Sequence, residues 1–247
     1  MSGHSKWAQI KRQKGANDAR KGAVFTRLAR ELQVAAREGG TDPAGNARLR
    51  LAIQKARAEN MPQENIRRSI ERAAGPGAEA IEEITYEGYG PGGTAILVQA
   101  ITDNRNRTVS EIRAAFTRGG GGLGEAGCVA WNFESRGVIS IPIGKRAAED
   151  IALVAIDAGA EDVNEDEFSV EVYTDPAALE RVRDALVAAD VPIESAETTI
   201  LPKSTVDLDD ERSLQVIKLV ERLENLDDVQ HVFSNLELRD ELVVGSG

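Results

Sequence analysis

The chain has 247 residues, a formal net charge of −11, 41% apolar residues and 4% aromatic residues. This composition is typical of a globular protein and excludes an intrinsically disordered one, and the length suffices for one large or several small domains. Because no apolar run approaches the roughly 20 residues that span a bilayer, and no secretory signal or cysteine pair is present, we expect a cytoplasmic protein without a membrane partner.

The first 75 residues predict a small helical bundle. Residues 17–38 place apolar side chains on one face of a helix and arginines on roughly the opposite face. Asp42-Pro43 opens a second helix that ends near Met61, and a third begins at Pro62 and stops at Gly75.

Positive charge is concentrated in these helices and in the segment before them. Residues 1–75 contain 16 Lys and Arg against 7 Asp and Glu, whereas the rest of the chain contains 14 against 34. No acidic residue precedes Asp18, and Trp7 lies among the cations. A solvated charged face is the ordinary alternative, but cations that bind phosphate beside a ring that stacks on bases favour nucleic acid as the partner.

We predict two nucleic-acid-binding surfaces: an extended arm over residues 3–22, and the arginine face of the helix that follows. The candidate residues are His4, Lys6, Trp7, Lys11, Arg12, Lys14, Arg20, Lys21, Arg27 and Arg30. Arg105 and Arg107, at the entrance of a later helix, are a candidate secondary phosphate contact, although N-capping alone explains the amides beside them.

The residues that follow change to the two-residue period of strands. Strands are expected at 81–87 and 94–102 around a glycine-rich turn, followed by a helix at 108–118 and a strand at 128–134. From Gly137 the order is β-α-β-β-α-β, which is the ferredoxin-like order. An amphipathic helix near residues 214–223 and a strand at 229–236 could complete the sheet begun at residue 81.

The predicted fold class is therefore multi-domain α+β. An N-terminal helical bundle occupies residues 1–76, and a discontinuous α+β domain occupies 77–135 plus 205–247. A ferredoxin-like domain, residues 136–204, is inserted into the second.

Patterns for catalysis or cofactor binding are sparse. G-x-G-x-x-G sets begin at Gly88, Gly119 and Gly122, but none joins a strand to a helix N-terminus, so we interpret them as hairpin and helix-end glycines. Cys128 is expected as a small buried residue in a strand, and no metal-ligand spacing is present. We expect no cofactor, no metal, no small-molecule substrate and no enzymatic activity; an enzyme with an unrecognised site is the remote alternative.

Short motifs run in order across nearly all of the chain. They are Gly3-His-Ser-Lys-Trp7, Ile10-Lys11, Phe25-Thr-Arg-Leu28, Ala35-Ala-Arg-Glu-Gly-Gly40, Asn60-Met-Pro62, Glu87-Gly-Tyr-Gly-Pro-Gly-Gly93 and Thr102-Asp-Asn-x-Asn-Arg-Thr108. Through them the chain resembles the YebC/PmpR family, which is related to the mitochondrial translational activator of cytochrome oxidase.

The resemblance implies a three-domain cytosolic protein that regulates gene expression. Bacterial members are described as probable transcriptional regulators that bind DNA, whereas some resemble ribosome-associated factors that relieve stalling at proline-rich stretches. DNA and ribosomal RNA therefore both stay open as partners, and the ribosome is a candidate partner. The mobile character of a glycine-interrupted cationic arm favours a structured RNA surface, because DNA readout usually employs a recognition helix.

Overall fold

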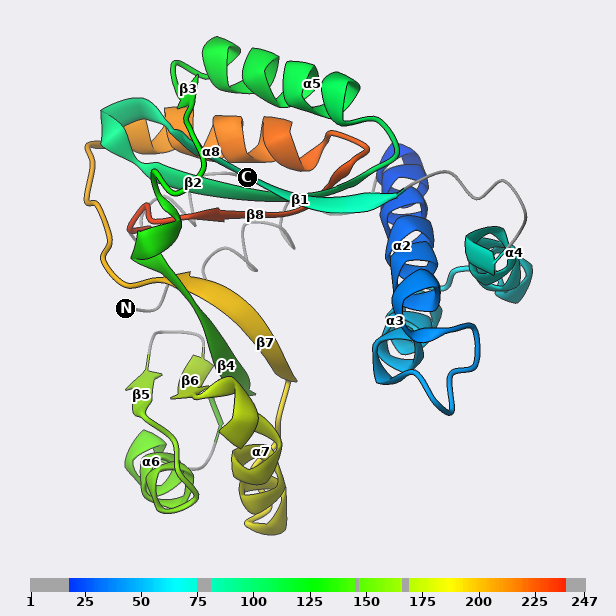
Figure 1. Ribbon diagram of the computed structural model, residues 1–247. Coiled ribbons are helices and arrows are strands. Elements are labelled where there is room, and N and C mark those ends of the chain that lie inside the picture. The colour runs from blue at the N-terminus through cyan, green and yellow to red at the C-terminus, as the bar shows by residue number, and fades with distance from the viewer. Residues whose placement is uncertain (1–17, 75–80, 145–146, 166–168, 239–247) are drawn as a thin grey trace. The chain divides into compact units, whose positions relative to one another are not determined.

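The computed structural model describes residues 18–74, 81–144, 147–165 and 169–238 (Figure 1). These residues form two compact units, one with residues 131–213 and 235–238 and the other with residues 18–130 and 214–234. Helices and two antiparallel sheets make up the units, so the multi-domain α+β class is confirmed. The bounds of the three domains expected from the sequence, 1–76, 77–135 plus 205–247, and 136–204, stay a prediction.

In the described part of the N-terminal bundle the helices are α2 (Asp18–Gly39), α3 (Ala47–Ala58) and α4 (Gln63–Ala74). Leu28 and Leu32 of α2 are buried against Leu49 of α3 and Ile66 of α4 in one apolar cluster. The helical-wheel face predicted for α2 is therefore its packed face.

The second helix starts later than the sequence predicts. Asp42 and Pro43 lie in a turn, and α3 begins at Ala47 because Asn46 is its N-cap, with Oδ1 accepting from the Leu49 N–H at 3.0 Å. The Asn46 side-chain amide also donates to the carbonyl oxygens of Ala35 at 2.6 Å and Gly40 at 2.8 Å. One buried amide thus begins α3 and ties it to the end of α2.

The first sheet has the strand order β3-β1-β2-β8 with antiparallel neighbours. Its strands are β1 (Glu82–Tyr89), β2 (Ala95–Thr102), β3 (Gly122–Leu123) and β8 (Val229–Ser234). The 3-10 turn η1 (Pro91–Gly93) joins β1 to β2. Helices α5 (Arg105–Arg118) and α8 (Asp210–Glu224) supply Phe116, Leu219 and Leu223 to the core against Ile96 of β2 (Figure 1). The C-terminal helix and strand therefore complete the sheet that begins at residue 82.

The second sheet has the order β5-β6-β4-β7, again with antiparallel neighbours. Its elements are β4 (Phe133–Pro142), α6 (Ala148–Asp157), β5 (Asp162–Glu165), β6 (Ser169–Thr174), η3 (Pro176–Ala178), α7 (Leu179–Ala188) and β7 (Ser195–Pro202). Both helices pack on one face, where Ala155 and Leu186 meet Ile139 and Val172. This chain order and strand order are ferredoxin-like, as predicted.

One pair of expected strands is wrong. The structure replaces the strand expected at 128–134 and the first strand expected after Gly137 with a single strand, β4, preceded by the 3-10 turn η2 (Ala130–Asn132). Gly137 does not end a strand. It lies within β4 and pairs with Thr174 of β6 on one side and with Thr198 of β7 on the other. A Cβ at this position would lie 2.3 Å from the Thr174 hydroxyl oxygen, so glycine is needed there for close strand packing.

We predict that Gly121→Ala lowers the free energy of unfolding by about 1–3 kcal/mol, because the structure leaves no room for a methyl group. A Cβ on Gly121 would lie 2.3 Å from the Tyr89 carbonyl oxygen, whereas a Cβ on the adjacent Gly122 would meet no atom of the described chain within 4 Å. Urea denaturation of both variants tests this. Equal losses for Gly121→Ala and the control Gly122→Ala would contradict the packing argument.

Candidate nucleic-acid interface

The predicted interface residues divide into those inside and those outside the described structure. His4, Lys6, Trp7, Lys11, Arg12 and Lys14 lie outside the described residues, and so do the side chains of Arg20 and Lys21, although both belong to α2. Arg27 and Arg30 of α2, and Arg105 and Arg107 of α5, are described. Their surroundings decide which guanidinium groups are available to a ligand.

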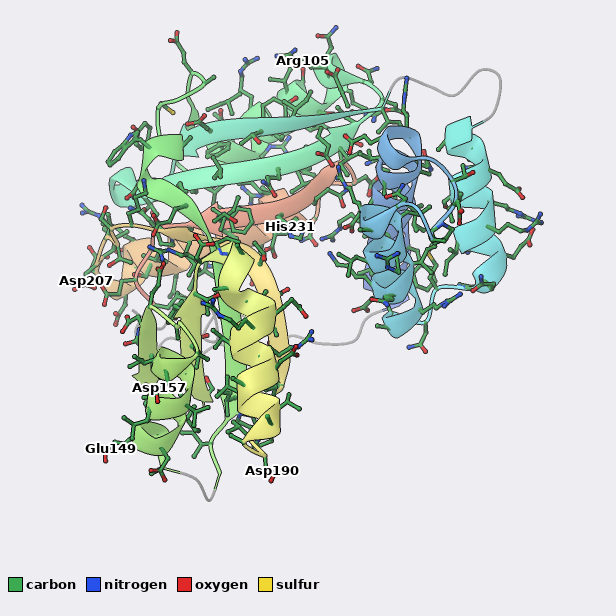
Figure 2. All side chains as sticks on the ribbon, turned by 60° about the horizontal axis from the view of Figure 1, so that its bottom comes forward. Arg105, Glu149, Asp157, Asp190, Asp207 and His231 are labelled. Carbon is green, nitrogen blue, oxygen red and sulfur yellow. The ribbon has the colours of Figure 1, made fainter. Side chains whose placement is uncertain are left out.

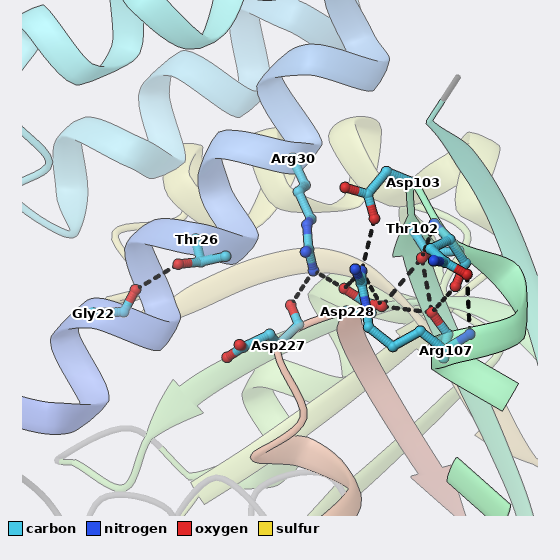
Figure 3. Close-up of polar contacts among 10 residues, drawn as sticks. Gly22, Thr26, Arg30, Thr102, Asp103, Arg107, Asp227 and Asp228 are labelled. Atoms are coloured by element: carbon cyan, nitrogen blue, oxygen red, sulfur yellow. Dashed lines mark hydrogen bonds and ion pairs between the residues drawn. The ribbon is translucent and has the colours of Figure 1, made fainter. Parts of the chain in front are cut away.

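Arg30 is held by the turn that precedes β8. Its guanidinium forms an ion pair with Asp228 and donates to the carbonyl oxygen of Asp227 (Figure 3). The Asp228 side chain is 1% exposed and that of Arg30 is 17% exposed, so this pair is largely shielded from solvent. The hydrogen bond from Arg30 to Asp227 joins residues that are 197 positions apart in the sequence.

Arg107 binds the same carboxylate from the first turn of α5. Its Nη2 lies 3.1 and 2.9 Å from the two oxygens of Asp228 and 2.7 Å from Oδ1 of Asp103. The Thr102 hydroxyl donates to Asp228 Oδ2 at 3.1 Å, and the Thr108 hydroxyl hydrogen-bonds the same oxygen (Figure 3). Asp228 therefore has two cations and two hydroxyl groups around it.

The surroundings of Asp228 keep it ionised. Burial raises its pKa, but the hydrogen bonds from Thr108 and Arg107 and the charges of Arg30 and Arg107 outweigh burial, so that the pKa lies below its ordinary value. Hydrogen bonds to Asp228 and Asp103 raise the pKa of Arg107. The cluster is thus a fully charged, hydrogen-bonded network rather than a proton-transfer site.

Two of the predicted phosphate ligands consequently have an anionic partner within the protein. Arg30 is mostly enclosed, whereas the Arg107 side chain is 41% exposed and shares its guanidinium between two carboxylates. Arg105 is exposed at the start of α5 (Figure 2), and Arg27 is half-buried, with an Nε that has no hydrogen-bond partner among the described residues. Contact of any of the four with nucleic acid stays a prediction.

Asp228 is not among the candidate residues that we predicted from the sequence. It follows Asp227 between the end of α8 and the start of β8, where an acidic pair ordinarily indicates a solvated turn. No local pattern indicates that one of the two carboxylates is buried while the other is exposed. The Thr102-to-Thr108 motif holds three of the four side chains described around Asp228, and Arg30 is the fourth.

A second buried carboxylate explains the glycine-rich segment that follows β3. Glu87 of β1 accepts hydrogen bonds from the backbone N–H groups of Gly127 at 2.6 Å, Val129 at 2.8 Å and Ala130 at 2.7 Å. Burial raises the pKa of Glu87, but the hydrogen bonds from these three N–H groups together outweigh burial, and the net pKa is below the ordinary value. The N–H groups that could have cradled a phosphate are therefore bound to the protein's own anion.

Cys128 lies in this segment, in a turn rather than in the expected strand, and is half-buried. Burial raises the pKa of its thiol, and the negative charge of Glu87 raises it further. A thiol with a raised pKa is a poor nucleophile at neutral pH because little thiolate is present.

Among the residues that the structure describes, no group of three or more His, Cys, Asp or Glu side chains could hold a metal ion. None of the described helices combines the length and the apolar character that a membrane crossing requires.

Comparison with known proteins gives full-length matches. Residues 5–76 match the family model for the TACO1/YebC protein N-terminal domain, and residues 81–236 match that for the TACO1/YebC second and third domain. Proteins named probable transcriptional regulatory protein from Roseiflexus castenholzii and Chloroflexus aggregans are each 53% identical over 98% of this chain, covering 97% and 98% of the relatives. A relative from Dehalococcoides mccartyi with the same description is 52% identical over 98% of this chain and 97% of its own length.

A solved structure is also similar. The crystal structure of a conserved hypothetical protein, Aq1575, from Aquifex aeolicus matches with a TM-score of 0.78 and 47% sequence identity. The match covers 91% of this chain and 93% of that one. These comparisons confirm the family resemblance and the fold class derived above.

Asp228→Asn is expected to lower the free energy of unfolding at pH 7 by about 2–4 kcal/mol, because it leaves two arginines beside a neutral group. Since the pKa of Asp228 is lower in the folded than in the unfolded protein, its stabilisation is complete above about pH 5 and is lost as the pH falls through 4 and below. Urea denaturation from pH 7 to pH 3 measures the effect, and the difference between the two proteins should shrink with acid.

The matched control for this prediction is Asp227→Asn. Asp227 is exposed and supplies Arg30 with a backbone carbonyl oxygen, which the substitution retains. We expect a change within about 0.5 kcal/mol. If the two variants lose the same stability, or if Asp228→Asn loses none, the network does not have the structural role assigned to it.

Proposed function

Because this chain belongs to the TACO1/YebC family, we propose that it regulates gene expression by binding nucleic acid through its basic N-terminal part, residues 3–30. The observation that supports the proposal most is the division of charge between 16 cations and 7 acids in residues 1–75 and 14 cations and 34 acids in the rest. The names of the full-length relatives, probable transcriptional regulatory proteins, support a role in gene expression. The proposal includes no catalytic step.

The binding mechanism follows from electrostatics. Lysines and arginines that neutralise phosphates release condensed counterions, so affinity should fall steeply with salt. The acidic remainder of the chain repels phosphate and restricts contact to the N-terminal part. Trp7 adds stacking on an unpaired base, a contribution that depends little on salt.

The first candidate ligand is promoter DNA, in agreement with the names of the relatives, which describe transcriptional regulation. One observation favours RNA as the second candidate. Arg67 of α4 lies 2.8 Å from Glu64 and 2.9 Å from Glu71, and Arg68 lies 2.9 Å from the same Glu64. A helix that reads base edges presents donors to the major groove, whereas α4 presents alternating carboxylates and guanidinium groups.

In the RNA alternative, the protein binds the ribosome. A cationic arm with one aromatic ring suits insertion into a structured RNA surface with unpaired bases. In this case the protein would be a ribosome-associated translation factor that relieves stalling at proline-rich stretches. Crosslinking in cells, followed by sequencing of bound DNA and RNA, separates the two candidates: enrichment of promoter fragments supports the first, and a dominant share of ribosomal RNA supports the second.

Reversal of the arm charges by Lys6→Glu, Lys11→Glu, Arg12→Glu and Lys14→Glu together should abolish binding to a labelled DNA duplex and to a structured RNA hairpin. It should also reduce the magnitude of the slope of log affinity against log salt concentration by about 3–4. Fluorescence anisotropy over a salt series measures both quantities.

The control for this experiment reverses four exposed cations elsewhere, namely Arg113, Arg118, Lys203 and Lys218. It changes the net charge equally, and we expect it to keep most of the affinity. Binding that survives reversal of the arm would refute the proposal, and an equal loss in the control would reduce it to an effect of net charge.

The two arginines at the start of α5 should behave differently. Arg105→Gln removes an exposed cation and should weaken nucleic-acid binding about twofold or threefold without changing stability. Arg107→Gln removes two hydrogen bonds to Asp228 and should cost about 1–3 kcal/mol of unfolding free energy. Anisotropy and urea denaturation of both variants test this. If Arg107→Gln weakened binding and Arg105→Gln lowered stability instead, Arg107 would be the phosphate ligand.

A further inference from the structure

The positive charge of the helical bundle is unevenly available among its described helices. On α2, Arg30 is paired with Asp228, and Arg27 is half-buried. On α4, Arg67 and Arg68 are paired with glutamates of the same helix. Most of the described cations of α2 and α4 are therefore engaged or enclosed by the protein itself.

Helix α3 differs from both neighbours because it carries four cations and no acid. Arg48 pairs with glutamates of α2 and β1, and Lys55 lies 3.4 Å from a glutamate of α2. Arg50 and Arg57, by contrast, form no ion pair with any described residue. Arg50 donates instead to the carbonyl oxygen of Pro43 at 2.9 Å, which leaves its charge uncompensated. Helix α3 thus keeps two guanidinium charges for a ligand.

These two arginines lie on the same side of α3. Arg50, Gln54 and Arg57 follow one another at positions i, i+4 and i+7, which share one face of a helix, and all three are exposed. Leu51 lies beside them and is 64% exposed. The opposite side packs into the bundle core through Leu49, Ala52, Ile53 and Ala56. We call Arg50, Leu51, Gln54 and Arg57 the outward face of α3; it offers hydrogen-bonding groups and one apolar side chain without a carboxylate.

The outward face of α3 matches the groups that base pairs present in the major groove of DNA. Arginine donates to guanine, the amide of glutamine binds adenine, and an apolar side chain contacts the methyl group of thymine. From Arg50 to Arg57 the helix rises by about 10 Å, which corresponds to about three base-pair steps. The major groove of A-form RNA is too narrow for a helix. The face therefore fits duplex DNA better than double-stranded RNA.

We propose that the outward face of α3 enters the major groove of duplex DNA. Arg50, Gln54 and Arg57 face the base edges and the adjoining phosphates, while Leu51 contacts thymine methyl groups. This statement rests on the proposed function and selects its DNA alternative, in which the arm adds phosphate contacts of its own. It moves the candidate interface of the described bundle from α2 to α3.

The first test removes both unpaired charges from the full chain with Arg50→Gln and Arg57→Gln together, the α3 variant. Its affinity for a labelled DNA duplex of mixed sequence should fall about fivefold or more, because two phosphate or base contacts are lost. The slope of log affinity against log salt concentration should decrease in magnitude by about 2. Fluorescence anisotropy over a salt series measures both quantities, and circular dichroism checks that the fold is retained.

The matched control removes two exposed arginines from the neighbouring helix α4, with Arg67→Gln and Arg68→Gln together. It changes the net charge of the same bundle equally, but both arginines are paired with glutamates in the unsubstituted protein. We expect the affinity of the control to stay within about twofold. Equal losses in the two variants, or no loss in the α3 variant, would overturn the proposal.

A second duplex tests the groove itself. Replacing its cytosines with glucosylated 5-hydroxymethylcytosine fills the major groove with sugar but leaves the phosphates unchanged. The unsubstituted protein should bind the plain duplex about fivefold more tightly than the glucosylated one, and the α3 variant should bind the two alike. If the unsubstituted protein does not distinguish the two duplexes, α3 does not lie in the major groove.

The same measurements separate this proposal from the proposed function. Binding that is lost on charge reversal of the arm but kept by the α3 variant would refute the role of α3 and uphold the proposed function. Binding that survives charge reversal of the arm but is lost in the α3 variant would do the opposite. A loss on a structured RNA hairpin as large as the loss on the duplex would refute the choice of DNA, and absence of binding to either probe would refute both proposals.

Discussion

A buried negative charge at Asp228 holds together three segments that are far apart in the chain. Arg30 comes from the helical bundle, Thr102 and Arg107 flank the passage from β2 to α5, and Asp228 itself precedes β8. Its backbone carbonyl also accepts from the Ile101 N–H at 2.8 Å. Removal of either arginine leaves this buried carboxylate less well compensated, so the three segments stabilise one another. The predicted arginine face of α2 is therefore partly a structural face.

Local periodicity in the sequence suffices to predict most of the helices and strands, but it does not predict contacts between distant residues. The apolar spacing at Leu28 and Leu32 predicts the packed face of α2, and element order predicts the ferredoxin-like sheet. The start of α3 is missed because Asn46 is fixed by the carbonyl of Ala35, and β4 is divided wrongly because Gly137 is required by Thr174 across the sheet. Asp228 has no signal of its own, since a buried acid and an exposed one look alike in sequence.

Charge counted in a sequence differs from charge available to a ligand. In the described part of the helical bundle, Arg48 lies 2.6 Å from Glu38 and also pairs with Glu83, and Arg67 and Arg68 pair with acids of α4. Most such pairs are exposed and weak, so phosphate can compete for them, but each lowers the local potential. The segment before Asp18 contains no acid, so no ion pair between side chains can form within it. Among the described helices, by contrast, several cations are offset by acids of the protein itself.

The return of β8 to the edge of β2 has a consequence for synthesis of the chain. Phe133 at the start of β4 pairs with Pro202 at the end of β7, so the segment that forms the second sheet has adjoining ends, and this sheet can close once residue 202 is available. The first sheet cannot, because its β2 edge, an almost wholly apolar strand, stays unpaired until residues 229–234 follow. During synthesis the second sheet can therefore close before the first sheet is complete, and β2 keeps an unpaired, aggregation-prone edge until its last partner strand follows.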